Sequence, residues 1–226
     1  MPDPTPAQRA PNTPAKQWLA HGAALAPEEL ANIEHAVGEE LWSEVSMPLT
    51  IHDYARVKGL MLNGGPVNDA AVAWLCAKDS PLTALTALYL TETQVTDQCI
   101  AALTAKDSPL TQLTTLTLEG TRVTDQGIAA LAAKDSSLTA LTVLDLGRTK
   151  VTDEGIQALA AKDSPLTKLT TLSLYKTIVS DNGMAALAAS DSPLTALADL
   201  DVSETWVCMD AIAALKRRFP NIRVCS

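Results

Sequence analysis

The stretch VTDQGIAALAAKDSSLTALTVLDL occupies residues 123–146, and close copies of it lie on both sides in the sequence. A leucine at the same place in each copy recurs every 28 positions, at Leu82, Leu110, Leu138, Leu166 and Leu194. A more divergent copy that begins near residue 54 falls on the same grid, so six copies are readable. A fixed period of about 20 to 50 residues is typical of a solenoid, whose units must stack because none can bury an apolar face alone. The sequence therefore predicts a stacked repeat domain.

The apolar pattern changes within each copy, and this change separates a strand from a helix. Leucine alternates with other residues over 115–119, which predicts a short strand with its leucines inward. Thr124 or Asp125 is suited to begin a helix, because a hydroxyl or carboxylate there accepts hydrogen bonds from free backbone N–H groups. We expect Lys134 near the helix end and residues 135–136 to close it, with proline following in most copies. Each copy therefore predicts a strand, a turn, a short helix and a return.

The pattern L-x-x-L-x-L-x-x-T-x-V-T-D-x-G-I-x-A-L resembles the leucine-rich repeat, and its 28-residue length is similar to the ribonuclease-inhibitor-like class of that family. The resemblance covers the chain from about residue 54 onward. It implies an α/β leucine-rich repeat solenoid, a right-handed superhelix in a horseshoe arc, with a parallel sheet on the concave face and short helices on the convex face. The regular T-x-V-T-D-x-G copies resemble bacterial members, so we expect a bacterial origin.

The chain departs from the family pattern after each strand, where the family usually has asparagine. Here the position is threonine, at Thr93, Thr121, Thr149, Thr177 and Thr205. A hydroxyl can still bond the neighbouring loop backbone, although it offers fewer groups than an amide. We therefore predict a threonine ladder through the stack.

Both ends of a repeat stack need a cover, because an open end exposes core and an unpaired strand edge. We expect a disordered leader over 1–20, a helical N-terminal cap over 21–53, and six repeats over 54–207 that start near residues 54, 82, 110, 138, 166 and 194. Residues 208–226 predict a last helix and a cap strand, in which Phe219 covers the core. The N-terminal cap rests on apolar residues at helical spacing: Leu30, Ile33, Val37, Leu41 and Val45.

Composition limits the classes of partner and the cellular compartment that we expect for this protein. The formal net charge of −9 disfavours nucleic-acid binding, which needs a broad basic face. No apolar run reaches the roughly 18 residues that cross a bilayer, and no secretory signal is apparent, so we expect no membrane partner and a cytoplasmic protein. The alternative is secretion as an effector by a signal-peptide-independent route. We expect a monomer with reduced, mostly buried thiols, and a bridge between Cys208 and Cys225 is the alternative.

Residues that could suggest catalysis recur in every copy, as structural devices do. A Lys-x-Ser pair at Lys106 and Ser108 has counterparts in the next two repeats, and the aspartate of V-T-D recurs as a predicted helix cap at Asp97, Asp125, Asp153 and Asp181. The histidines match no metal-binding spacing. Cys99 could be a reactive thiol at a helix start or a buried filler. We therefore expect no enzyme activity, no cofactor and no metal.

Positions that vary between the copies are candidates for recognition. Those beside the inward leucines are expected to project from the concave face, and they are Tyr89, Glu92, Gln94, Glu119, Arg122, Asp145, Arg148, Lys150, Tyr175, Lys176, Asp199, Asp201, Glu204 and Trp206. Arg122, Arg148, Lys150 and Lys176 predict a basic ridge, and the aromatic residues are of the kind enriched at protein interfaces. The alternative is a solvated face with intramolecular salt bridges.

These residues favour a non-enzymatic module that binds a protein partner. A bacterial effector or ubiquitin-ligase adaptor is the alternative, because LAPEELANIEHAV at 25–37 loosely resembles the start of an F-box, although too few residues precede the repeats for the whole module. Ribonuclease-inhibitor-like repeats also occur in GTPase activators, which is a further alternative in which Arg122 or Arg148 acts at the partner's active site.

Overall fold

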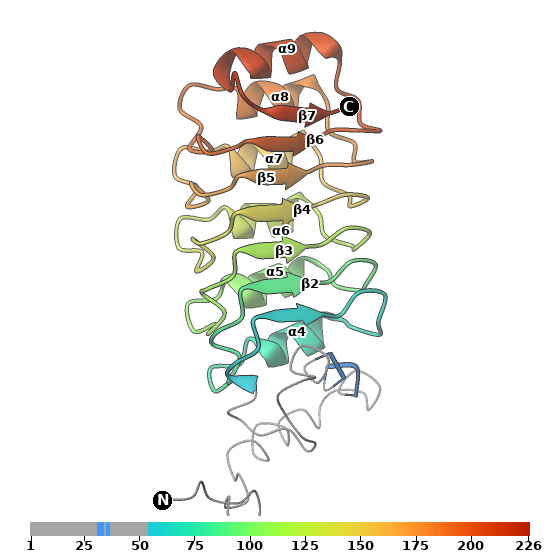
Figure 1. The fold of residues 1–226 in the computed structure, drawn as a ribbon, viewed down its shortest axis with the longest axis vertical. Coiled ribbons are helices and arrows are strands. Elements are labelled where there is room, and N and C mark those ends of the chain that lie inside the picture. The colour runs from blue at the N-terminus through green and yellow to red at the C-terminus, as the bar shows by residue number, and fades with distance from the viewer. Residues whose placement is uncertain (1–30, 34, 37–53) are drawn as a thin grey trace, which may run out of the picture.

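Seven parallel strands form one sheet in the computed structural model, which describes residues 31–33, 35–36 and 54–226. Their order in the sheet is their order in the sequence: β1 (Gly59–Met61), β2 (Ala87–Tyr89), β3 (Thr115–Thr117), β4 (Val143–Asp145), β5 (Thr171–Ser173), β6 (Asp199–Asp201) and β7 (Arg223–Cys225). Each strand pairs with the equivalent residues of the next repeat, as Leu88 does with Leu116. Figure 1 shows the strands stacked along the long axis of the molecule.

One helix follows each strand from β1 to β6 and lies behind the sheet in Figure 1. The helices are α4 (Asp69–Leu75), α5 (Asp97–Thr104), α6 (Asp125–Leu131), α7 (Asp153–Leu159), α8 (Asp181–Leu187) and α9 (Met209–Arg218). Consecutive helices contact each other along the stack. The helices thus cover one face of the sheet, and the other face carries the partly exposed strand residues.

The repeat helices are shorter than the sequence predicts. The helix α6 ends at Leu131, and Lys134 lies beyond it in a turn that includes the bond from the Ser136 N–H to the Ala133 carbonyl. A seven-residue helix is about 10 Å long, and the chain must then return to the opposite end of the sheet to begin the next strand. The turn therefore replaces the last helical turn that we expected.

The core is a continuous column of leucines between sheet and helices. Leu116 and Leu118 are fully buried, as are their counterparts in the neighbouring repeats. Ile33 and Ala36 lie in helical segments and belong to the same core cluster. Apart from residues 31–33, 35 and 36, the predicted N-terminal cap and the leader fall outside the described part of the chain, so this cap stays a prediction.

The predicted threonine ladder is confirmed. Thr93, Thr121, Thr149 and Thr177 are buried, and each hydroxyl donates to the carbonyl three residues earlier over 2.6 to 2.7 Å. Thr205 makes the same bond to Val202 over 2.5 Å. A buried hydroxyl needs such a partner, so this position closes the turn that follows every strand.

The aspartate of V-T-D caps the helix of the next repeat, whereas the sequence predicted a cap on its own helix. In α6 the N-cap is Thr124, whose hydroxyl accepts from the Gln126 N–H. The N–H groups of Thr124 and Gly127 donate to Oδ1 of Asp97 over 2.8 and 3.0 Å, and the Thr124 hydroxyl donates to its Oδ2 over 2.7 Å. We call this contact the aspartate clamp. It joins each helix start to the one before it.

The aspartate clamp recurs along the stack. The same three bonds are made by Asp69, Asp125 and Asp153, and Asp181 accepts from the Cys208 N–H over 2.7 Å. That bond lowers the pKa of Asp181. At the equivalent position of the sixth repeat the residue is Met209. No further repeat helix follows α9 in the described residues, so a carboxylate there has no helix start to cap.

The C-terminal segment packs against the last repeat. Phe219 and Ile222 are buried in the core cluster, and Val224 lies in β7, which pairs with β6. The strand begins at Arg223, so Ile222, which we expected in it, lies just before it.

Candidate functional site

The turn after each strand places one side chain at the rim of the sheet in a left-handed backbone conformation. Glu92, Arg148, Lys176 and Glu204 have φ angles between 53° and 57°. Glycine fills the same position in two other repeats, at Gly64 and Gly120. We call these six positions the turn column. Left-handed backbone is costly for residues with a Cβ atom, so four repeats carry a charged side chain where glycine fits more easily.

Arg148 in the turn column bridges two repeats. Its Nη1 lies 2.8 Å from Oε1 of Glu92 and 4.0 Å from Oε1 of Glu119. Gly120 lies between Arg148 and Glu92 in the column, and a Cβ there would approach Cγ of Glu92 to 3.1 Å. The absence of a side chain at Gly120 therefore leaves room for Arg148 to reach the carboxylate two repeats away.

A second cluster lies at the rim in the next two repeats. Lys176 Nζ lies 3.4 Å from Oε2 of Glu204, and the Tyr175 hydroxyl donates to Oε1 of the same carboxylate over 3.0 Å. This hydrogen bond raises the pKa of Tyr175, because deprotonation would lose it and place a second negative charge beside Glu204. Glu204 thus orients one aromatic and one cationic side chain at the rim.

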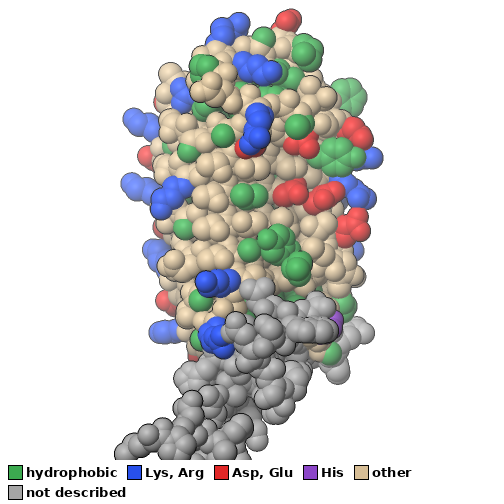
Figure 2. Space-filling model, in the orientation of Figure 1, with side chains coloured by type: hydrophobic (Ala, Val, Ile, Leu, Met, Phe, Trp, Pro, Cys, Tyr) green, Lys and Arg blue, Asp and Glu red, His purple; other side chains and the backbone are tan. Residues whose placement is uncertain are grey.

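The aspartates on the strands themselves already have partners. Asp145 accepts from the Gly147 N–H and Asp201 from the Ser203 N–H, each over 2.9 Å. Asp199 pairs with Arg223, which extends over it from β7. In Figure 2 the middle of the sheet face is mostly uncharged. Acidic side chains gather on the right, where the strands end, with a few basic ones beside them, and further Lys and Arg side chains line the left edge. Acidic charge on this face is therefore concentrated at the rim where the strands end.

The four residues of the predicted basic ridge are divided between two adjacent columns. Arg148 and Lys176 belong to the turn column and are ion-paired with glutamates. Arg122 and Lys150 are exposed two positions further along the chain, and the described residues include no ion pair or hydrogen bond for either side chain. Two of these four cations, Arg148 and Lys176, therefore form intramolecular salt bridges, as the alternative interpretation predicted.

Arg122 and Lys150 belong to a separate line of exposed side chains, which we call the outer column: Gln94, Arg122, Lys150, Ile178 and Trp206. Ile178 is 60% exposed and Trp206 is 75% exposed. The sequence prediction missed Ile178, because it selected the variable positions by charge and aromatic character. Its position, 28 residues before Trp206, was the signal that could have found it.

The predicted aromatic anchors do not form one cluster. Tyr89 is a partly buried residue of β2, and the strands β3 and β4 separate it from β5, after which Tyr175 follows. Tyr175 and Trp206 lie nearer to each other in the stack, because each follows one of two adjacent strands, β5 and β6. The aromatic character of this face is therefore divided between the two halves of the sheet.

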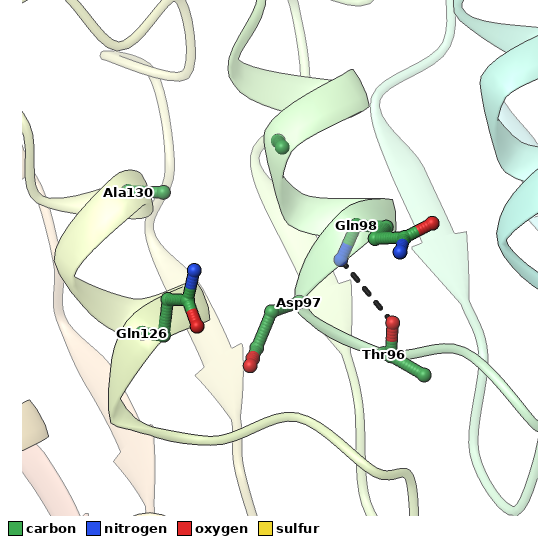
Figure 3. A pocket seen from close by; sticks show the side chains of 6 residues that line it. Thr96, Asp97, Gln98, Gln126 and Ala130 are labelled. Atoms are coloured by element: carbon green, nitrogen blue, oxygen red, sulfur yellow. Dashed lines mark hydrogen bonds between the residues drawn. The ribbon is translucent and has the colours of Figure 1, made fainter.

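On the helix side, a shallow space of about 300 Å³ lies between α5 and α6 (Figure 3). It is lined by Thr96, Asp97, Gln98, Ala101, Gln126 and Ala130. Asp97 is the only carboxylate in this lining, and its oxygens accept from Thr124 and Gly127. The carboxylate of this space therefore belongs to the aspartate clamp, whereas Gln98 and Gln126 contribute amide side chains that take no part in it.

Two of the four cysteines are buried and two are exposed, and all four are free thiols. Burial raises the pKa of Cys76 to about 12 and that of Cys99 well above its usual range. Cys99 is therefore a buried thiol rather than an activated one. The alternative bridge between Cys208 and Cys225 is not formed, and the exposure of these two residues corrects the expectation of mostly buried thiols.

The described residues contain no cluster of histidine, cysteine, aspartate and glutamate that could hold a metal ion. Within the same residues, no helix is long and apolar enough to cross a membrane.

Comparisons with known proteins agree with this architecture. A family model described as "Leucine Rich repeat" matches residues 137–160. No curated protein matches the chain. An internalin from Listeria monocytogenes is similar in structure, with a TM-score of 0.53 and 22% identity over 86% of this chain. This chain covers 55% of that internalin, about half of its length. An internalin C2 from the same organism gives a TM-score of 0.51 and 22% identity over 85% of this chain and 81% of its own.

Proposed function

Because this chain is a leucine-rich repeat protein, we propose that it acts as a non-enzymatic module that binds a protein partner through the open sheet face and its charged rim. The fold alone does not define the function, so the proposal rests on the residues of the site. The ribonuclease-inhibitor-like class, the bacterial origin and the cytoplasmic location stay predictions.

The observation that carries the proposal is the left-handed backbone of four charged residues in the turn column. Glu92, Arg148, Lys176 and Glu204 all have positive φ angles, although glycine serves the same turn at Gly64 and Gly120. Strained backbone that persists at a surface motivates a functional hypothesis. Since glycine can form this turn, the four charged residues add only their side chains to it.

The ion pairs at the rim are too weak to explain these side chains by stability. A left-handed residue with a Cβ costs roughly 1 to 2 kcal/mol. An exposed ion pair contributes about 0 to 1 kcal/mol, and the pairs of Arg148 with Glu92 and of Lys176 with Glu204 are exposed. The balance favours a role for the charges outside the folded chain. Charges at an interface rim mainly select partners and speed their association.

The test is a double variant, Arg148→Gly with Lys176→Gly, used as bait for proteins from a lysate of the native organism. Glycine fits both turns, so the variant removes two rim charges without backbone strain. We expect it to lose partners that the unchanged chain captures. The thermal unfolding temperature should not fall.

The matched control is Lys134→Ala with Lys162→Ala, which removes the same charge from exposed positions beyond α6 and α7. This control should keep all partners. Equal capture by the rim variant, the control and the unchanged chain would reject the rim as the binding surface.

No specific observation favours either alternative function. Arg148, which a GTPase-activator role would present to a partner, is held by Glu92 and Glu119. The segment that resembles an F-box start lies largely outside the described residues.

A further inference from the structure

The outer column has a basic part and an apolar part, and the ion pairs of the rim account for neither. Arg122 and Lys150 occupy consecutive repeats, and Ile178 and Trp206 occupy the next two. We propose that this column binds an amphipathic helix of the partner, with two carboxylates against Arg122 and Lys150 and two apolar side chains against Ile178 and Trp206. This inference rests on the proposed function and names the chemistry of the partner.

The backbone holds the outer column in line along the stack. The N–H of Arg122 donates to the Val95 carbonyl, and those of Lys150 and Trp206 donate to Val123 and Val179, over 3.0 to 3.2 Å. A buried valine follows each of the first four column residues, whereas Val207 after Trp206 is partly buried. Most column residues also have a buried threonine before them. With both chain neighbours fixed in this way, the intervening side chain projects outward.

The charges of the two cations are available to a partner. The described residues contain no recorded ion pair or hydrogen bond for the side chain of Arg122 or Lys150, whereas Arg148, Lys176 and Arg223 are paired with carboxylates. Two exposed cations on a chain of net charge −9 favour an acidic ligand at this place.

The apolar half favours a helix that also carries large apolar side chains. Ile178 and Trp206 are two of the four large hydrophobic residues that are exposed in the described part of the chain. Tryptophan is the residue type most often found at interface hot spots, together with tyrosine and arginine. Their burial by a partner would remove apolar surface from water directly beside the cations.

The spacing of the column matches successive turns of a helix. Parallel strands, and the repeats that carry them, lie about 4.8 Å apart, and the pitch of an α-helix is about 5.4 Å. Side chains of a helix at positions i, i+4, i+7 and i+11 form one stripe. A helix laid along the column therefore brings one side chain of each turn to one repeat. An extended strand places same-face side chains about 6.6 Å apart, which matches less well.

A polyanion such as a nucleic acid is the less favoured ligand, although cations and an aromatic residue are present. The neighbouring rim carries Glu92, Glu119 and Glu204. A nucleic acid would meet these carboxylates along its whole backbone, whereas a helix can place its two acidic residues over the cations alone.

The test is a displayed library of helical peptides in which positions i, i+4, i+7 and i+11 are randomised. On the unchanged chain we expect enrichment of aspartate or glutamate at two adjacent positions and of apolar residues at the other two. On the variant Arg122→Glu with Lys150→Glu, we expect lysine or arginine at the first two positions and the same apolar residues. A peptide selected on the unchanged chain should lose at least tenfold in affinity for this variant and for Ile178→Ser with Trp206→Ser.

Three outcomes would overturn the inference. They are the same residue classes selected on both chains, a single-stranded oligonucleotide that competes with the peptide, and self-association of the unchanged chain that Trp206→Ser abolishes. Failure of the proposed function is recognised separately. If the double outer-column variants keep every lysate partner that the Arg148→Gly and Lys176→Gly variant loses, the rim binds the partner and only this inference fails.

Discussion

The contacts on the helix side of the stack recur from repeat to repeat, whereas the side chains on the sheet rim vary. On the helix side, the aspartate clamp recurs at five successive junctions with the same acceptor atom. On the sheet rim, no two consecutive repeats have the same residue in the turn column or in the outer column. Most backbone bonds under the two columns are nevertheless equivalent from repeat to repeat. Stability therefore resides in the recurring contacts, which leaves the rim side chains available for recognition.

The largest effect is expected from removing a clamp in the middle of the stack. Asp125→Ala leaves the N–H groups of Thr152 and Gly155 and the Thr152 hydroxyl without their acceptor. Unmade bonds of partly buried donors to a carboxylate should lower the free energy of unfolding by about 2 to 4 kcal/mol. Urea unfolding followed by far-ultraviolet circular dichroism measures this loss.

Two control variants isolate the clamp. Asp163→Ala removes an exposed carboxylate, and Met209→Asp adds one where no further helix start follows among the described residues. Both should unfold like the unchanged chain. If Asp163→Ala costs as much as Asp125→Ala, the general charge balance and not the clamp stabilises the stack.

A smaller effect should follow from adding a methyl group under the same carboxylate. A Cβ on Gly155 would lie 2.5 Å from Oδ1 of Asp125 and 3.0 Å from Cγ1 of Val151. Gly155→Ala should cost about 1 to 2 kcal/mol. At the equivalent position the N–H of Cys99 still donates to Asp69, which shows that the backbone can adjust to a side chain there. The double variant with Asp125→Ala should lose less than the sum of the two single variants. Strict additivity would mean that carboxylate and glycine do not depend on each other.

The threonine ladder should contribute less per site than the clamp. Thr149→Val keeps the shape of the side chain and removes its hydrogen bond to the Leu146 carbonyl, which still accepts from the Thr149 N–H. We expect a loss of about 1 kcal/mol. Thr167→Val at an exposed position is the reference, and an equal change in both midpoints of urea unfolding would assign no stability to the ladder.

The smallest effect, and of opposite sign, is expected at the rim. Lys176→Gly removes an exposed ion pair with Glu204 and relieves a left-handed backbone. The free energy of unfolding should stay unchanged or rise by up to about 1 kcal/mol. A clear loss of stability would show that the charged rim serves the fold, and it would weaken the distinction between the two sides of the molecule.

The period of the sequence was sufficient to predict the fold, since a leucine or threonine at a fixed place in every repeat can only meet its counterparts when the repeats stack. Leu116, Leu118 and the threonine ladder are placed as expected for this reason. The aspartate clamp was not predicted, because its acceptor and donors are 27 to 30 residues apart in the sequence. Local helix-capping patterns describe only contacts within one turn.

The candidate site was predicted less well than the fold. Arg122 and Arg148 were expected in one ridge, but one belongs to the outer column and the other to the turn column. Arg148 lies at a left-handed position and is ion-paired with Glu92, and no charge pattern in a sequence carries that backbone angle. The glycines at 64 and 120 were the available sign of the left-handed turn.

The clamp also bears on how long such a protein can be. Each 28-residue unit carries an aspartate for the helix start that follows it and the donors for the aspartate that precedes it. A further unit inserted between residues 137 and 138 would satisfy both neighbours without any new chemistry, whereas one added after Met209 would meet a methionine where a carboxylate is needed. The number of units can therefore grow from within the chain, and each added unit lengthens the turn column and the outer column by one residue.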